Sequence, residues 1–268
     1  MADIRQLERP LRGTLRHGEP MSKHVSWRAG GRARTFYHPA DVPDLCTFLG
    51  TLPRDEPLLF VGLGSNLLVR DGGFAGTVVF THHALTGIDI ADGGLSPGHE
   101  PGVRPRVVAG AGVPLPHVAR FVAKHGGAGG EWMAGVPGTV GGALAMNAGC
   151  YGGETWDIVE RAVTIDRDGE VRERDKKEYQ IGYRHCGLAR EEWFIGAYFR
   201  LRPGDGLASR ARIKELLARR MATQPLTLPN AGSVFRNPPG DHAARLIESC
   251  GLKGLSRGGA RVSAVQAR

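Results

Sequence analysis

The sequence predicts a protein of the α+β class, because several short strands precede a helix and a later segment forms a hairpin. Apolar runs that end in or near glycine predict three strands, at 58–62, 77–81 and 106–110. A helix is expected at 114–126, where Val118, Phe121 and Val122 have helical spacing and proline and glycine mark the two ends. Two alternating runs around Arg-Asp-Gly predict a β-hairpin at 158–174.

Two further segments before the middle of the chain are expected to lack regular structure. The stretch up to about residue 24 is polar, and we expect it to be irregular. Residues 91–105 have the glycine- and proline-rich composition of a mobile surface loop.

The last third of the chain begins with a strand at 192–203 that is stopped by proline. A helix follows at 207–222. Its apolar face consists of Ile213, Leu216, Leu217 and Met221. We expect its arginine-rich outer face to be solvated surface. The proline-rich segment 223–240 ends this helix, a second helix starts in HAARLIESCGLKG, and a domain boundary is predicted at about 204.

The composition is that of an ordinary globular protein with an excess of basic residues and glycine. The formal charge is +8, and 40 of the 268 residues are glycine. Such a charge suits nucleic acid, a membrane surface or an acidic small molecule. The basic residues are scattered, with no run longer than RDKKE and no interleaved aromatic residues. The charge therefore indicates an anionic small-molecule substrate or a simple compositional bias, and we expect neither nucleic acid nor a membrane as partner.

Potential metal ligands are not grouped in this sequence. The four cysteines have no metal-ligand spacing and are expected to be free thiols: Cys46, Cys150, Cys186 and Cys250. The histidines at 24, 38, 82 and 83 are not grouped with acids or cysteines, so no metal is expected. The first residues contain no apolar core of the kind that signal peptides have, and no apolar run approaches the length of a membrane span. These observations favour a cytoplasmic protein.

Two glycine-bearing stretches are candidates for a ligand site. The first is GLGSN at 62–66, directly after a predicted strand. Its glycines can expose backbone N–H groups, and Ser65 and Asn66 add short donors, which together suit a diphosphate. The pattern is neither GxGxxG nor GxxxxGK[ST], so a plain turn remains the alternative.

The second stretch is GVPGTVGGALAMNAGCYGG at 135–153, which contains seven glycines. A helix interior does not tolerate so many glycines, because each costs about 0.5–1 kcal/mol relative to alanine. Val136, Val140, Leu144 and Met146 are core-type residues, so a polar linker is excluded. A packed loop along a flat cofactor and a buried crossing of two backbones both remain open.

Several motifs, in order, carry a family resemblance. They are MSKHVSWRAGG at 21–31, GLGSN, the glycine-rich stretch, GYR at 182–184 and NAGSVFRNPPG at 230–240. The chain resembles the shorter type of the UDP-N-acetylenolpyruvoylglucosamine reductase (MurB) family. The resemblance implies a lead-in at 1–23, a two-subdomain FAD-binding domain of the vanillyl-alcohol-oxidase (PCMH) type at 24–204, and a partial α+β substrate domain at 205–268.

The same resemblance implies a reaction. It is the NADPH-dependent, FAD-mediated reduction of an enolpyruvyl ether of UDP-N-acetylglucosamine to UDP-N-acetylmuramate for peptidoglycan, by a monomer. Arg184 would bind the growing enolate, since a guanidinium stays charged and can fork onto a carboxylate. Ser233 would give the proton to C2. Tyr183, Arg236 and Asn237 would contact the substrate.

FAD would be held by residues of both glycine-bearing stretches. They are Gly62, Leu63, Gly64, Ser65, Asn66, Val136, Pro137, Gly138, Gly141, Gly142, Asn147 and Gly149. A bulky residue at Gly141 is therefore expected to abolish flavin retention before it abolishes folding.

One departure from the family concerns its C-terminal catalytic glutamate. The chain reads GGARVSAVQAR at its end, and no residue matches that glutamate; Glu248 is expected to be a solvated helix residue. A truncated or weakly active reductase is thus expected. A non-catalytic flavin or UDP-sugar binding protein is the first alternative, and another oxidase or dehydrogenase of the same flavin fold is the second.

Overall fold

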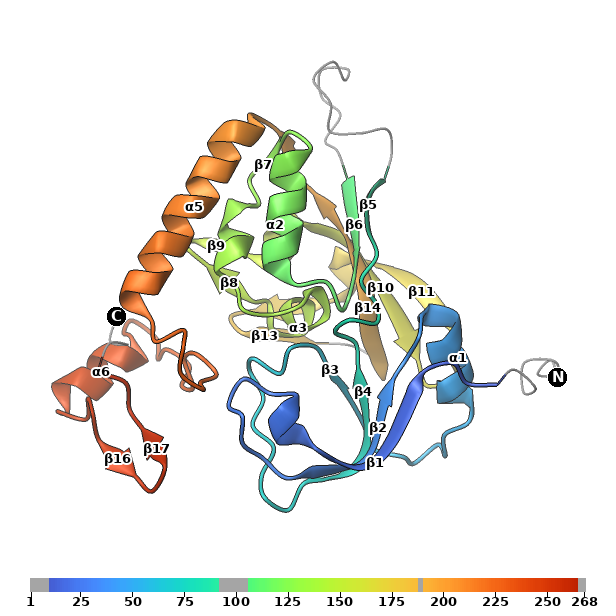
Figure 1. Ribbon diagram of the computed structural model, residues 1–268. Helices are drawn as coiled ribbons and strands as arrows, with labels where there is room; N and C mark the ends of the chain where they lie inside the picture. Colours follow the sequence, from blue (N-terminus) through green and yellow to red (C-terminus); the bar gives the residue numbers. More distant parts are fainter. Residues whose placement is uncertain (1–9, 92–105, 188–189, 265–268) are drawn as a thin grey trace.

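The computed structural model describes residues 10–91, 106–187 and 190–264, which form two β-sheets with helices against them (Figure 1). The first sheet has the strand order β1–β2–β4–β3. The bounds of its strands, in that order, are Thr14–Pro20, Arg32–His38, Phe74–Phe80 and Leu58–Val61. β1 pairs antiparallel with β2, whereas β2, β4 and β3 are parallel.

The second sheet is antiparallel throughout and has the order β11–β10–β14–β6–β5. Its strands span, in that order, Val171–Asp175, Val159–Asp166, Glu192–Arg200, Arg106–Gly110 and Ile88–Ala91. The hairpin predicted at 158–174 is β10 and β11. Its Gly169 has φ +78°, a conformation that favours glycine.

The helices lie mainly around the second sheet. The α-helices are α1 (Val42–Gly50), α2 (Leu115–Lys124), α3 (Val140–Met146), α4 (Thr155–Ile158), α5 (Gly206–Thr223) and α6 (Ala243–Ser249). Three 3₁₀ turns are η2 (Met21–Lys23), η3 (Glu131–Gly135) and η4 (Lys176–Glu178). None of the described helices is long and apolar enough to cross a membrane.

Four two-stranded ribbons complete the described structure. They are β7 (Gly127–Ala128) with β15 (Arg202–Pro203), β8 (Gly149–Cys150) with β9 (Gly153–Glu154), β12 (Gln180–Gly182) with β13 (His185–Gly187), and β16 (Ser256–Arg257) with β17 (Ala260–Arg261). The ribbon β12–β13 carries Arg184 in its turn.

The predicted strands and helices are confirmed, with two corrections. The opening stretch is not irregular throughout, because Thr14–Pro20 forms the edge strand β1. Most of its residues are exposed, so the sequence there lacks the apolar alternation that marks a strand. The glycine-rich stretch is not a loop throughout, because it contains the helix α3. Of the loop predicted at 91–105, Ala91 ends β5, and 92–105 lie outside the described residues.

The described residues form three apolar clusters, and two of them join the sheets to helices. The larger one joins the second sheet to α2, α3 and α5, and includes Leu115, Leu144 and Ile213. A second cluster places α1 between the two sheets, where Phe48 and Ile195 are buried together. Helix α5 thus packs into a core whose other residues lie before position 204, and β1 belongs to the first sheet although it lies before position 24. The domain divisions at 23 and 204 stay predictions.

The C-terminal segment 224–264 has no buried residue. Leu228, Val234 and Phe235 are all more than 60% exposed. The segment contacts the loop between η2 and β2, where the Asn230 N–H donates to the Ser26 carbonyl at 3.2 Å. That contact brings the predicted serine loop over the GLGSN turn.

Candidate active site

A cleft of about 570 Å³ lies between the first sheet, the turn before α3, and the C-terminal segment. Its described lining comprises Lys23, His24, Val25, Ser26, Arg28, Leu63, Ser65, Phe80, His82, His83, Pro137, Arg220, Leu226, Leu228, Asn230 and Gly232. Three of these residues carry fixed positive charge, and none of the described lining residues is acidic. The cleft therefore suits an anionic ligand.

The GLGSN turn reaches this cleft because its glycines allow close contact with two neighbouring segments. A Cβ at Gly62 would lie 2.0 Å from the Thr139 Oγ1, and one at Gly64 would lie 2.3 Å from the His24 carbonyl oxygen. Gly64 also has φ +59°, which disfavours other residues. The Ser26 N–H donates to the Gly64 carbonyl at 3.2 Å. These contacts fix the turn in a position where Ser65 lines the cleft.

Two residues next to this turn each carry a buried side-chain hydroxyl group that has no hydrogen-bond partner among the described residues. These groups are the Ser26 Oγ and the Thr139 Oγ1. An unsatisfied buried polar group costs about 1–3 kcal/mol, so such a group is informative when it lies at a site. Hydroxyl donors beside a basic cleft suit phosphate oxygens, and the residues present therefore fit a dinucleotide diphosphate.

The stretch 135–149 presents two different faces. Val136, Val140 and Leu144 are buried in the larger apolar cluster, while Gly142 and Ala145 are exposed. The apolar side chains therefore anchor the stretch from its buried face. Small residues on the outer face leave room for a flat ligand.

The glycines of this stretch differ in how much room a Cβ would have at each position. A Cβ at Gly138 would have the Ser65 Oγ as its nearest neighbour at 3.6 Å, and one at Gly142 would meet only the Thr139 Oγ1, at 3.9 Å. A Cβ at Gly141 would instead lie 2.9 Å from the Ala111 Cβ. At Gly149 it would lie 2.6 Å from the Gly153 carbonyl oxygen. Protein packing is thus sufficient reason for Gly141 and Gly149.

Arg184 joins three of the predicted motifs. Its guanidinium donates to the Ser233 carbonyl at 3.0 Å, to the Phe235 carbonyl at 3.2 Å and to the Asn66 Oδ1 at 2.9 Å. Arg184 has φ +51°, and such strain in a non-glycine residue concentrates at functional sites. The Arg236 guanidinium in turn donates to the Arg184 carbonyl at 3.2 Å.

Three other predicted site residues lie in different surroundings. Tyr183 is about half exposed, at 52%, in the turn beside Arg184. Ser233 is exposed, and its carbonyl rather than its hydroxyl contacts Arg184. Asn237 uses its Oδ1 to accept the N–H of Ala243, the first residue of α6, at 3.1 Å.

Among the residues predicted to contact FAD, Asn147 has the contacts that differ most from this prediction. It is buried, and its side-chain amide makes all of its described hydrogen bonds within the protein. Leu63, Ser65 and Pro137, in contrast, line the cleft directly.

Sequence reasoning missed most of the charged residues of the cleft. Lys23 and Arg28 lie in the MSKHVSWRAGG motif, but neither is among the predicted site residues. Arg220 lies on the arginine-rich helix α5, whose outer face was predicted to be solvated. Burial lowers the pKa of Arg220, and its guanidinium forms no ion pair with any residue in the described ranges. The signal that could have revealed Arg220 is its place in the last turn of the helix that precedes the serine motif.

Comparison with known proteins identifies the class. Residues 34–174 match the family described as FAD binding domain. The crystal structure of cholesterol oxidase from B. sterolicum superposes with a TM-score of 0.50 at 16% identity, over 73% of this chain and 39% of that one, which shows the fold alone. The predicted α+β FAD-binding fold of the vanillyl-alcohol-oxidase type is confirmed. The chain is an FAD-dependent oxidoreductase.

The remaining matches identify the family within that class. Residues 224–268 match the UDP-N-acetylenolpyruvoylglucosamine reductase C-terminal domain. Reductases of that name from Thiobacillus denitrificans and Nitrosomonas eutropha are 59% and 54% identical, over 94% and 96% of this chain and 79% and 77% of theirs. The Thermus caldophilus reductase structure gives a TM-score of 0.78 at 28% identity, over 96% of this chain and 86% of that one. The chain belongs to the UDP-N-acetylenolpyruvoylglucosamine reductase family, as the motifs predicted.

Proposed function

We propose that this protein reduces the enolpyruvyl ether of UDP-N-acetylglucosamine to UDP-N-acetylmuramate for peptidoglycan, with NADPH as reductant. The observation that carries the proposal is the meeting of Arg184, Asn66 and the Ser233 loop beside a basic cleft. We further propose that it acts on this small molecule as a cytoplasmic monomer, without nucleic acid or a membrane as partner.

The cleft residues are suited to hold the flavin and the substrate phosphates. Bound FAD would carry hydride equivalents from NADPH to the substrate. We assign the FAD diphosphate to the GLGSN turn, where the Ser26 and Thr139 hydroxyls have no other partner among the described residues. The exposed face of 137–142 would then lie along the cofactor, and Lys23, Arg28 and Arg220 would balance the negative charge of the two ligands.

Arg184 is suited to stabilise the substrate as it is reduced. Hydride addition at C3 leaves negative charge at C2 that spreads into the carboxylate, so a fixed cation there binds the transition state more tightly than the substrate. The guanidinium already points at carbonyl and amide oxygens, which are the same kind of acceptor as a carboxylate oxygen.

Ser233 is suited to deliver the proton to C2. An ordinary serine hydroxyl is a weak acid, so it can donate only to a strongly basic carbon or when neighbours polarise it. The contact between Arg184 and the Ser233 carbonyl holds the serine loop beside the cation that would bind the carboxylate. The two groups would therefore act on adjacent atoms of one substrate.

The proposal is tested by following flavin absorbance in two separate half-reactions. Anaerobic NADPH should bleach the flavin bands of the native protein, and the enolpyruvyl UDP-sugar should restore them. Arg184→Lys keeps the positive charge but loses the paired N–H donors of the guanidinium. It should therefore slow reoxidation of the flavin by the substrate by about 10²–10³-fold, the range for loss of one oxyanion donor. Flavin content and reduction by NADPH should change far less.

Two outcomes would contradict this function. Protein that takes up no FAD would remove the cofactor from the proposal. Flavin that NADPH reduces but the substrate does not reoxidise would favour the non-catalytic binding protein. Ser233→Ala distinguishes the mechanism: unchanged reoxidation would exclude this serine as the proton donor.

A further inference from the structure

Asn147 occupies a strained and buried position at the end of α3. It has φ +41° and is 4% exposed. Asparagine tolerates this left-handed conformation better than most residues, and here it ends a helix. The position by itself would suit asparagine or glycine equally, so the side chain needs a separate explanation.

The side-chain amide of Asn147 forms hydrogen bonds inside the protein with both its nitrogen and its oxygen. The Nδ2 donates to the Glu154 Oε2 at 2.8 Å and to the Gly182 carbonyl at 3.2 Å. The Oδ1 accepts the Trp156 N–H at 3.1 Å. An asparagine has two amide hydrogens, and both are engaged, so neither is left for a cofactor.

One of these contacts reaches the turn that carries Arg184. Gly182 is the last residue of β12, and its carbonyl directly precedes Tyr183 and Arg184. Two-residue hairpin turns prefer glycine or asparagine where φ is positive, so an arginine there needs support from outside the hairpin. Asn147 lies 35 positions away in sequence and supplies a hydrogen bond at the base of the turn.

We propose that Asn147 is a positioning residue for Arg184, with Glu154 orienting its amide. Glu154 holds one amide hydrogen, which directs the other at the Gly182 carbonyl. The carbonyl fixes the hairpin, and the hairpin directs the guanidinium at the Ser233 loop and Asn66. This inference rests on the proposed function for the role of Arg184, and it replaces flavin contact as the reason for asparagine at 147.

The test uses Asn147→Gly, because glycine keeps the left-handed backbone and removes only the amide. Hydrogen exchange of the 180–187 amides should accelerate by about tenfold, as expected from the loss of hydrogen bonds of ordinary strength. The exchange of α2 is the internal reference and should not change. Flavin content and the flavin spectrum should stay at the native level.

Reoxidation of reduced flavin by the enolpyruvyl UDP-sugar should slow by about tenfold in Asn147→Gly, with kcat falling more than KM rises. Glu154→Ala should reproduce both effects if Asn147→Gly does not fold, and Glu154→Gln, which keeps an acceptor oxygen, should largely restore both. Loss of flavin with unchanged exchange of the hairpin would overturn the proposal and make Asn147 a cofactor ligand.

Unchanged exchange and unchanged reoxidation in Asn147→Gly would also overturn it. The failure of the proposed function looks different. In that case Arg184→Lys itself would leave reoxidation unchanged, while the faster exchange of the hairpin in Asn147→Gly would still be seen.

Discussion

At the scale of single residues, Tyr179 shows a polar atom that the fold buries without use. Its ring packs against Trp156 and Phe194, with ring centroids 4.7 Å and 5.6 Å apart. Its hydroxyl has no partner among the described residues. Burial, with a smaller effect of Glu192, raises the pKa of Tyr179 far above its usual range, so the hydroxyl stays neutral.

Tyr179→Phe should therefore leave the free energy of unfolding unchanged or raise it by about 1 kcal/mol, because it removes an unsatisfied polar atom and keeps the ring. Denaturant unfolding of the two proteins measures the difference. Tyr179→Ala is the matched control and should lose about 3–5 kcal/mol, the usual range for deletion of a buried ring. A clear loss in Tyr179→Phe would show that the hydroxyl has a partner.

At the scale of elements, α3 separates two kinds of glycine in neighbouring positions. Gly141 lies against Ala111, and its N–H donates to the Ala111 carbonyl at 2.9 Å. Gly142 is exposed, and a Cβ built there would meet only the Thr139 Oγ1, at 3.9 Å. The same helix thus uses one glycine for packing and leaves the next open toward the proposed cofactor.

Gly141→Ala should destabilise the protein by about 1–3 kcal/mol, because the added methyl group overpacks the contact with Ala111. Gly142→Ala should instead stabilise the flavin-free protein by about 0.5–1 kcal/mol through helix propensity. If the flavin lies along this face, Gly142→Ala should also weaken FAD binding. Thermal unfolding without flavin and FAD titration measure the two effects separately.

This pair revises the expectation for Gly141. A bulky residue at Gly141 is now expected to impair folding before it impairs flavin retention. A flavin-binding defect in a well-folded Gly141→Ala protein would contradict this revision. An unchanged FAD affinity in Gly142→Ala would place the cofactor elsewhere.

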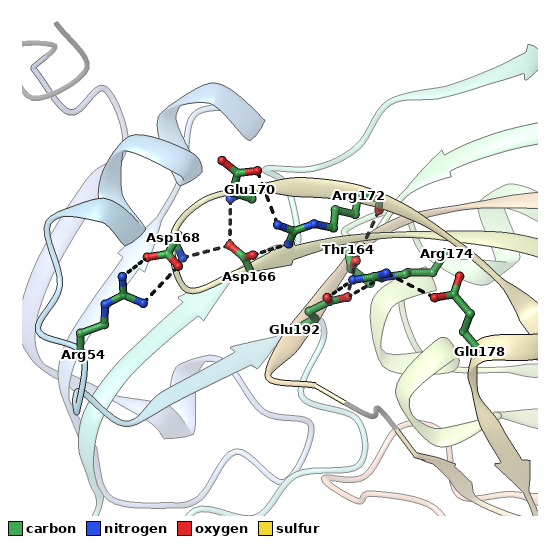
Figure 2. Close-up of polar contacts among 9 residues, drawn as sticks. All are labelled: Arg54, Thr164, Asp166, Asp168, Glu170, Arg172, Arg174, Glu178 and Glu192. Atoms are coloured by element: carbon green, nitrogen blue, oxygen red, sulfur yellow. Dashed lines mark hydrogen bonds and ion pairs between the residues drawn. The ribbon is translucent and has the colours of Figure 1, made fainter. Parts of the chain in front are cut away.

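At the scale of the whole molecule, charged side chains on the second sheet form a network that reaches Arg54 (Figure 2). Arg174 bonds the buried Glu192 with two guanidinium nitrogens, one of them at 3.1 Å, and also pairs with the exposed Glu178. Arg54 pairs with Asp168 across 114 residues of sequence. The network links the β10–β11 hairpin to the loop after α1.

The network predicts a pH dependence of stability. The hydrogen bond from Arg174 holds the pKa of Glu192 below its usual value, although burial opposes it. A carboxyl group with a lowered folded pKa stabilises the protein above its unfolded pKa of about 4.3, and the stabilisation is lost as pH falls through the folded pKa. Stability should thus decline below about pH 4.3.

Glu192→Gln should lower the free energy of unfolding at pH 7 by about 1–3 kcal/mol and reduce its slope between pH 4.3 and the folded pKa. Denaturant unfolding across that pH range measures both. Glu178→Gln, on the same arginine but exposed, should change stability by less than about 1 kcal/mol. Equal effects of the two substitutions would contradict the importance of the buried pair.

The sequence by itself determined most of the secondary structure and the order of the motifs. Strands β3, β4 and β6, helix α2 and the β10–β11 hairpin follow from periodicity and turn residues, which act over a few neighbouring positions. The family also followed from the ordered motifs. The edge strand β1 could not be predicted from the sequence, because most of its residues are exposed and show no apolar alternation.

Only the tertiary structure decided which residues face one another. Arg184 contacts Asn66 across 118 positions, and Asn147 contacts Gly182 across 35. No local pattern encodes either contact, because each depends on how separately formed elements pack. The structure therefore turned Asn147 from a predicted flavin ligand into a proposed support for Arg184. It also gathered Lys23, Arg28 and Arg220 into one basic cleft.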